Sequence, residues 1–192
     1  MLFEKNEIRD IVISVLVLAF VFSGLNIYLL PIMIIVIIVV FLLHEFGHKF
    51  SAQYFGCYAV YKMWPMGLLL GVFSGLLGGI IFAAPGAVYI YPYNKNKFAF
   101  NVANLTRREY GIISLAGPGV NIITGYVFTL LSYLFNYNVL FIIARIAFFL
   151  AIFNLIPIPP LDGYKVLAWD KKYWILSLIA AIIGYIIFGL LV

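Results

Sequence analysis

The sequence predicts an all-α polytopic membrane protein with five to six transmembrane helices, a small membrane-associated β-hairpin or sheet and a possible re-entrant segment. Hydrophobic residues make up 66% of the 192 residues and charged residues only 10%, whereas about half of a soluble domain is apolar. The apolar residues also gather in runs close to the ~20 residues that a helix needs to cross a bilayer. We expect one domain over residues 1–192.

Five apolar runs have the length expected of helical spans. They cover residues 11–30, 32–54, 110–135, 138–156 and 173–191. A tight turn near Asn26 and Pro31 joins the first two runs. Three prolines between Pro157 and Pro160 stop the fourth run, because proline cannot continue a helix.

Two segments between the second and third spans differ from the rest. Residues 67–83 are apolar but rich in glycine, so they either cross the membrane or enter and leave it on one side. Residues 84–109 are more polar, and they contain the stretch AVYIYPYNKNKFAF. Aromatic and β-branched residues on either side of a polar turn favour strands. This stretch therefore predicts two short strands around a turn.

The charges indicate an orientation in the membrane. The formal net charge is +5, and the basic residues are scattered rather than gathered in a stripe, which argues against nucleic acid as a partner. Basic loops of membrane proteins face the cytoplasm. With Lys5 inside and residues 67–83 re-entrant, both later basic stretches, 84–108 and Lys165 to Lys172, also fall inside. We therefore expect a cytoplasmic N-terminus and an external C-terminus in the plasma membrane.

Two histidines and a glutamate stand at the end of the second apolar run, in the stretch HEFGH. His44 and His48 are the only histidines of the chain, and their four-residue spacing puts both on one helix face, where they can reach one metal ion. Glu45 lies about 100° round the helix from His44 and can reach a water on that ion. In zinc peptidases such histidines hold the metal, and the glutamate takes a proton from the water. The alternative, histidines bonded only to neighbouring helices, is disfavoured because polar groups are costly in lipid.

A catalytic zinc usually has three protein ligands and one open position, so a carboxylate or the single cysteine, Cys57, must complete the site. The carboxylates other than Glu45 are Glu4, Glu7, Asp10, Glu109, Asp162 and Asp170. All but Asp162 belong to charged stretches typical of a membrane interface. Asp162 stands in FNLIPIPPLDGYK, and proline-broken backbone at membrane depth is tolerated only within protein or beside a cavity. We predict Asp162 as the third ligand, with Cys57 as the weaker candidate. An ordinary helix-ending turn is the alternative for this stretch.

Two asparagines in the expected spans are further candidates. Asn121 follows a stretch in which Gly117 and Gly119 thin the helix and Pro118 frees a backbone carbonyl. An amide in lipid needs hydrogen-bond partners. Asn121 and Asn154 therefore either hold helices together or line a functional site, and the sequence leaves both interpretations open.

Taken together, HEFGH, AGPGVN and FNLIPIPPLDG resemble the motifs of the site-2 protease family of intramembrane zinc metalloproteases. The resemblance in order and spacing covers roughly residues 32–165, which we expect to form the core. The combination of HExxH with N-x-x-P-x-P-x-L-D-G is specific to this family. The roles that the resemblance implies are one zinc ion per chain held by His44, His48 and Asp162, Glu45 as the catalytic base, and Asn121 and Asn154 as substrate-binding residues.

The resemblance also implies a function, namely hydrolysis of a peptide bond within transmembrane segments, as in regulated intramembrane proteolysis. The implied partners are the lipid bilayer and single-pass membrane-protein substrates, which pair with a sheet edge. The chain departs from many relatives in its glycine-rich insert at 67–83 and in lacking a PDZ or CBS domain. Two alternatives are a silent homologue acting as a scaffold or chaperone, and a metal transporter. An intact HExxH argues against the first, and the lack of a repeated half argues against the second.

Overall fold

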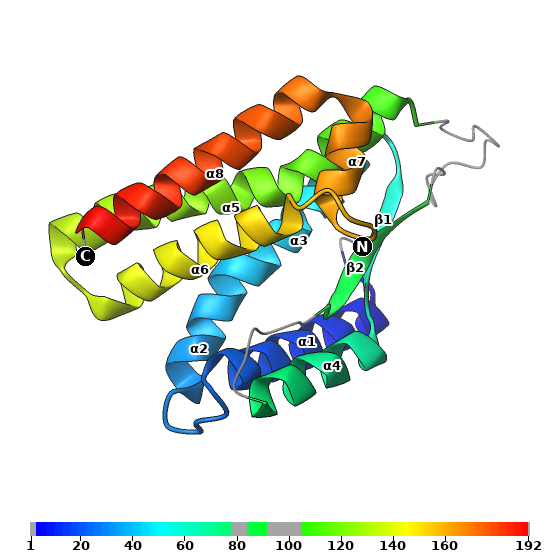
Figure 1. Cartoon of the computed structure of the whole chain (residues 1–192). Helices are drawn as coiled ribbons and strands as arrows, with labels where there is room; N and C mark the ends of the chain where they lie inside the picture. The colour runs from blue at the N-terminus through cyan, green and yellow to red at the C-terminus, as the bar shows by residue number, and fades with distance from the viewer. Residues whose placement is uncertain (1–2, 78–83, 92–104, 192) are drawn as a thin grey trace.

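The computed structural model describes residues 3–77, 84–91 and 105–191. In chain order its elements are α1 (Lys5–Phe22), α2 (Leu30–Ile37), the π-helical turn η1 (Ile38–Leu42), α3 (Leu43–Tyr54), β1 (Tyr58–Met63), α4 (Pro65–Leu76), β2 (Gly86–Tyr91), α5 (Arg107–Phe135), α6 (Asn138–Asn154), α7 (Asp162–Trp169) and α8 (Lys171–Leu191). Figure 1 shows α5, α6 and α8 running side by side, with α2 and α3 crossing them and α1 and α4 paired beyond. The prediction of a mainly helical chain with a small sheet is confirmed.

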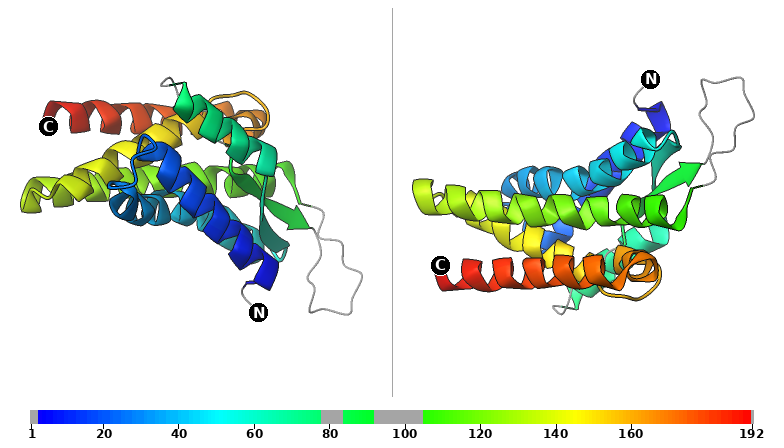
Figure 2. Two further views of the ribbon diagram at one scale, coloured as in Figure 1. Left: turned by 90° about the horizontal axis from the view of Figure 1, so that it is seen from below. Right: turned by 90° about the horizontal axis from the view of Figure 1, so that it is seen from above.

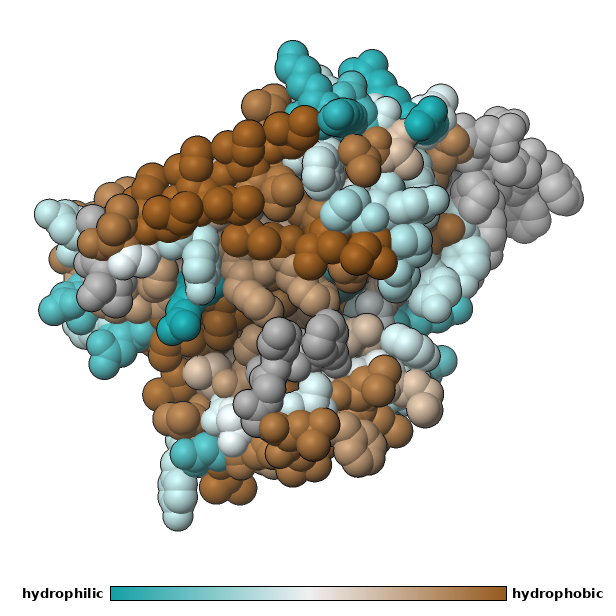
Figure 3. Space-filling model, in the orientation of Figure 1, coloured by the Kyte–Doolittle hydropathy of each residue, from teal (hydrophilic) through white to brown (hydrophobic). Residues whose placement is uncertain are grey.

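Among the described residues, three helices are long and apolar enough to cross a membrane, namely Leu30–Tyr54, Arg107–Phe135 and Lys171–Leu190. Helices α4 and α6 are apolar but shorter, and α1 carries several charged residues in its first two turns. Figure 3 shows hydrophobic residues covering α8, with hydrophilic residues gathered near its beginning. Length and composition therefore indicate a membrane protein, whereas the count of five to six spans stays a prediction.

The second predicted span is one helix that contains an irregular turn. Regular α-helix in α2 and α3 flanks the π-helical turn η1. In such a turn each N–H bonds five residues back, so the turn holds one residue more than an α-helical turn. Before η1, Val36 and Ile37 are buried in the core that α1 and α6 also form. After η1, α3 packs against α5.

The first span was predicted at 11–30, whereas α1 occupies Lys5–Phe22. A capping box between Glu4 and Glu7 begins the helix before the apolar run starts. The helix ends before Gly24 and Leu25, which both have positive φ angles. The predicted boundaries were wrong because the charged residues that precede the apolar run are helical too.

Those charged residues hold α1 against α3 and β1. Glu7 Oε1 accepts a hydrogen bond from Lys49 Nζ at 2.5 Å and another from the backbone N–H of Tyr61 at 3.0 Å. The side chains of Glu7 and Lys49 are 1% and 3% exposed. Asp10 accepts from the backbone N–H of Met63 at 3.3 Å. Because Lys49 comes directly after the HEFGH stretch, this buried network fixes the middle of α3 to the first helix.

The sheet consists of β1 and β2, which pair antiparallel with Tyr61 opposite Val88. Strand β2 coincides with the first strand of the predicted hairpin, but its partner β1 was not predicted. The second predicted strand lies outside the described residues. At the end of the sheet, the N–H of Trp64 donates to the carbonyl oxygen of Pro85 at 2.8 Å. The two ends of the segment that contains α4 therefore lie next to each other.

Candidate metal centre

Three predicted site residues lie together near the crossing of α3 and α5. Helix α3 supplies His44 and His48 one turn apart, and Asp162 is the first residue of α7. All three side chains are buried. Each offers one ligand atom, and these atoms all lie within 4.8 Å of one another. The fold thus brings the HEFGH stretch next to the aspartate that comes after the prolines.

The three ligand atoms form a nearly equilateral triangle. Nε2 of His44 and Nε2 of His48 are 3.1 Å apart, and Oδ2 of Asp162 lies 3.0 Å from the second and 3.5 Å from the first. Ligands at about 2.1 Å from a tetrahedral zinc ion are separated by about 3.4 Å. Two imidazoles and one carboxylate are also a ligand set that zinc accepts. The grouping therefore fits zinc binding.

A backbone carbonyl sets the tautomer of His48. Nδ1 of His48 lies 2.8 Å from the carbonyl oxygen of Ile113 on α5. Because a carbonyl oxygen can only accept, Nδ1 must carry the proton and donate it. The lone pair of the ring then resides on Nε2, the atom that faces His44 and Asp162. Metal-ligating histidines are commonly oriented in this way by a hydrogen bond from their second nitrogen.

Asn121 lies next to the second ring nitrogen of His44, as the carbonyl of Ile113 lies next to that of His48. It is fully buried on α5, and Nδ2 of its amide lies 3.1 Å from Nδ1 of His44. If Nε2 of His44 binds metal, Nδ1 carries a proton, and the amide atom that accepts it must be the oxygen. Oδ1 of Asn121 has no hydrogen-bond partner among the described residues, and exchanging the two amide atoms by a 180° turn would bring it to this proton. Asn121 therefore contacts the imidazole of His44 on the side away from the other ligand atoms.

Glu45 is buried beside the triangle but takes no part in it. Its charge is close enough to interact with those of His48 and Asp162. Oε2 of Glu45 is buried and, in the part of the chain that the structure describes, has no hydrogen-bond partner. A buried carboxylate oxygen without a partner is costly unless water or a substrate group satisfies it. Oε2 of Glu45 is therefore open to a water molecule or a substrate group.

The remaining candidates lie elsewhere. Nδ2 of Asn154 donates to the carbonyl oxygen of Leu150 within α6 at 2.9 Å, so a role in substrate binding stays a prediction. Cys57 packs in a small hydrophobic cluster with Ala52 and Ile113. Burial raises the pKa of the Cys57 thiol, which disfavours the thiolate that zinc prefers. Cys57 is not part of the grouping found among the described residues.

Sequence reasoning missed one charged neighbour of the centre. Lys165 was counted only as a basic loop residue, but its Nζ lies 3.2 Å from Oδ1 of Asp162. The two residues are three positions apart on α7, a spacing at which helical side chains meet. The short helix α7 was not predicted, because a run of prolines precedes it and only eight residues form it. The spacing would have been informative had the helix been recognised.

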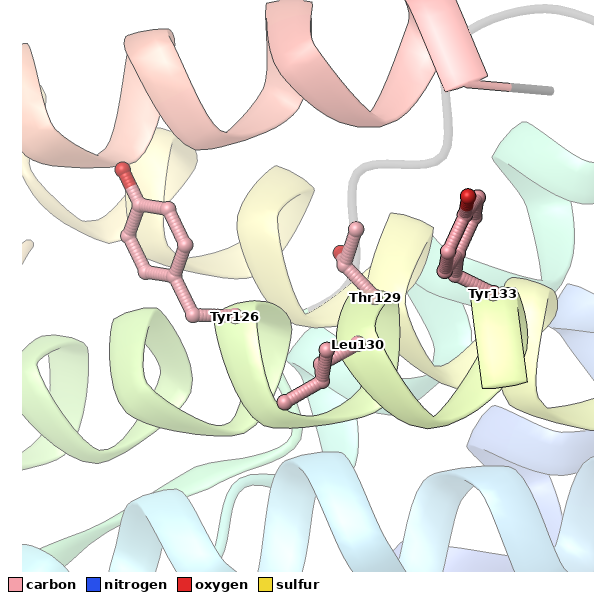
Figure 4. A pocket seen from close by; sticks show the side chains of 4 residues that line it. All are labelled: Tyr126, Thr129, Leu130 and Tyr133. Carbon is pink, nitrogen blue, oxygen red and sulfur yellow. The ribbon is translucent and has the colours of Figure 1, made fainter. Parts of the chain in front are cut away.

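A separate hollow lies on the other half of α5. Figure 4 shows that Tyr126, Thr129, Leu130 and Tyr133 line it, with the ring of Tyr126 directed toward α8. The hydroxyl of Tyr126 donates to the carbonyl oxygen of Ala180 at 2.9 Å and so links α5 to α8. The four lining residues include no histidine, cysteine or carboxylate, so the hollow has none of the ligand types found at the metal centre.

Comparison with known proteins gives three similar chains, each provisionally named as a zinc metalloprotease. A protein of Methanocaldococcus jannaschii is 39% identical over 97% of this chain and 95% of its own length. A protein of Bacillus subtilis is 28% identical over 72% of this chain and 68% of its own. A protein of Mycolicibacterium smegmatis is 31% identical over 65% of this chain and 51% of its own. No family model and no solved structure matches the chain.

Proposed function

The chain belongs to the site-2 protease-like family of zinc metalloproteases, and we propose that it is an intramembrane zinc metalloendopeptidase that cuts transmembrane segments of other membrane proteins. The observation that carries the proposal is the triangle of His44, His48 and Asp162. Both histidines, with Glu45 next to His44 in sequence, stand on a helix long and apolar enough to cross a membrane. A hydrolytic centre on such a helix can act on a peptide bond within the bilayer. We propose that each chain holds one zinc ion.

The three ligands and Glu45 divide the chemistry between them. His44, His48 and Asp162 would hold zinc, which when bound supplies a Lewis acid for the scissile carbonyl and makes water acidic enough to react near neutral pH. Glu45 takes the proton of the attacking water and passes it to the leaving amine. The carbonyl of Ile113 and the amide of Asn121 keep the imidazoles oriented during this exchange.

The substrate must be unwound before it can be cut, because the peptide bonds of a helix are shielded by their own hydrogen bonds. We propose that β2 receives the extended substrate by β-augmentation. The backbone N–H groups of Tyr61 and Met63 in β1 already donate hydrogen bonds to carboxylates of α1. The outer edge of β1 is therefore occupied, which leaves β2 to pair with a substrate. Helix-breaking residues near the scissile bond would favour cleavage, since they lower the cost of unwinding.

We also propose that the N-terminus is cytoplasmic, the C-terminus is external and α4 belongs to a re-entrant segment. The hydrogen bond from Trp64 to Pro85 supports this, because the segment between them begins and ends at one place. Helix α4 has twelve residues, or about 18 Å at 1.5 Å per residue, against a hydrocarbon core of ~30 Å. Figure 2 shows the two termini at opposite ends of the molecule, as an odd number of crossings requires.

The test uses the full chain in proteoliposomes with a panel of single-pass membrane proteins. Bound metal is measured by mass spectrometry, and fragments are mapped to locate the cut. Wild type should release fragments cut within the spanning segments, and Glu45→Gln should release none.

A zinc-loaded wild type that cuts nothing in the panel would favour the scaffold or chaperone. Zinc accumulation inside the vesicles that requires the chain would favour the transporter. Cleavage confined to loops outside the bilayer would contradict the intramembrane assignment.

A further inference from the structure

The two oxygens of the Asp162 carboxylate have different partners. Oδ2 faces Nε2 of His48 and Nε2 of His44, at 3.0 and 3.5 Å. Oδ1 accepts a hydrogen bond from Nζ of Lys165 at 3.2 Å. One oxygen therefore points to the other ligand atoms, and an ammonium group engages the second.

Lys165 contacts the metal centre from the surface of the protein. Its side chain is 31% exposed while that of Asp162 is 11% exposed, so the ammonium reaches inward from the edge of the protein. The charge of Lys165 also interacts with His44 and Glu45. Lys172, by contrast, has its backbone N–H bonded to Asp170 at the start of α8. Because Asp162 is buried, the ammonium of Lys165 balances a negative charge that water reaches poorly.

The number of carboxylate oxygens that bind zinc decides whether the centre can react. Two imidazoles and one carboxylate oxygen occupy three positions of a tetrahedral ion and leave the fourth for water or substrate. If both oxygens of Asp162 bound the ion, the protein would supply four ligand atoms. A site with four protein ligands is closed, as in structural zinc sites.

We propose that Lys165 is a positioning residue that keeps Asp162 a one-oxygen ligand and thereby keeps one metal position open. The proposal rests on the proposed zinc centre. The ammonium occupies Oδ1, so that only Oδ2 is presented to the ion. Lys165 does not touch substrate or the reacting atoms, and its effect passes through the orientation of Asp162.

The test compares Lys165→Met, which removes the donor at similar size, with Lys165→Arg, which keeps an N–H donor and a positive charge. Lys172→Met is the matched control, a lysine of the same polar region whose side chain is not part of the centre. Each protein is loaded with Co²⁺, whose visible spectrum changes with its ligand atoms and their geometry, and with zinc for kinetics. Circular dichroism checks the fold, and Lys165→Leu replaces Lys165→Met if the latter does not fold.

We expect the cobalt spectrum of Lys165→Met to differ from that of wild type, because a second carboxylate oxygen replaces water on the ion, whereas the spectra of Lys165→Arg and Lys172→Met match wild type. With zinc, Lys165→Met should lose about 10- to 100-fold in kcat, as is common for residues that orient metal ligands, with KM little changed. Cobalt spectra of Lys165→Met identical to wild type would overturn the proposal, as would an arginine variant that behaves like Lys165→Met. The spectra need no substrate, so failure of the proposed peptidase activity would be seen separately.

Discussion

The backbone of Gly117 on α5 lies directly against the imidazole ring of His48 on α3. A Cβ atom at Gly117 would overlap Nε2 of His48 and lie 2.8 Å from Cε1 of His44. The missing side chain is thus what lets α5 approach the face of α3 that carries both histidines. The same stretch of α5 supplies the carbonyl of Ile113 and the amide of Asn121.

Gly117→Ala should therefore damage the metal centre, because the added methyl must displace one or both imidazoles. Gly119→Ala is the matched control, since a Cβ there meets nothing within 4 Å. Both changes remove one helical glycine, so their effects on helix propensity are alike. We expect Gly117→Ala to lose about 10- to 100-fold in zinc affinity, in the range of other changes that misorient ligands. Equal zinc affinity in the two variants, measured by competition with a chelator, would contradict the close packing.

Glu45→Gln should abolish cleavage but keep zinc, because we propose Glu45 as the base and it is not in the grouping of ligand atoms. His44→Ala and His48→Ala should lose both. Metal content of the purified proteins and cleavage of one substrate are measured side by side. Zinc loss in Glu45→Gln as large as in the histidine variants would show that Glu45 binds the metal.

Asp162→Ala should weaken metal binding, whereas Asp170→Ala and Glu109→Ala should not. The structure explains the controls: Glu109 closes the capping box of α5 with Thr106, and Asp170 accepts the backbone N–H of Lys172. Both are carboxylates with local helix-capping roles. Metal content that stays unchanged in Asp162→Ala but falls in Cys57→Ala would show that the thiol of Cys57, and not Asp162, is the third ligand.

Asn121→Ala should lower zinc affinity, because it removes the group that fixes the ring of His44. Loss of such an orienting hydrogen bond typically costs about 10- to 100-fold. Asn154→Ala should leave zinc affinity unchanged, since the amide of Asn154 bonds only within its own helix in the described structure. A substrate-binding role for Asn154 would instead raise KM. Unchanged zinc affinity in Asn121→Ala would return Asn121 to the substrate-binding role that the sequence suggested.

Lys49→Met should destabilise the protein, because it leaves the carboxylate of Glu7 buried without its cation. Breaking one side of a buried pair costs about 3–5 kcal/mol. The double variant Glu7→Gln, Lys49→Met should recover part of that loss, since glutamine still accepts the N–H of Tyr61. Arg9→Met, which breaks a pair whose arginine is 61% exposed, is the control and should cost at most about 1 kcal/mol. Thermal unfolding in detergent measures all three, and a Lys49→Met no less stable than Arg9→Met would contradict the role of the pair.

Cysteine labelling tests the orientation. In a Cys57→Ser background, a reagent confined to the outside should label Leu190→Cys but not Lys95→Cys, which becomes accessible only after the membrane is permeabilised. Position 95 lies outside the described residues, but Trp64 and Pro85, which precede it in the chain, are hydrogen-bonded to each other. Labelling of 95 from outside, with none at 190, would mean that the segment containing α4 crosses fully.

The features that the sequence could reveal are those that depend on short-range interactions. The pairing of His44 with His48 depends only on helical spacing, and Asp162 was found because prolines break the chain beside it. The partner of β2 could not be found in that way, since β1 lies more than twenty residues earlier and its choice depends on the whole fold. The start of α1 was missed because the charge of Glu7 is satisfied by Lys49, a residue remote in sequence. No sequence motif can identify the carbonyl of Ile113 as a hydrogen-bond acceptor, because every residue has a backbone carbonyl.

The π-helical turn at Ile38–Leu42 sets a limit on how this chain can vary. Removing one residue from the turn would shorten the helix by only about 1.5 Å but would rotate α3 by about 100° relative to α2. The histidines would then face away from α5 while the upstream residues stayed in the core. Substitutions among the apolar residues of this stretch keep that alignment, and insertions or deletions of a single residue destroy it. The span is therefore tolerant of changes in composition and intolerant of changes in residue count.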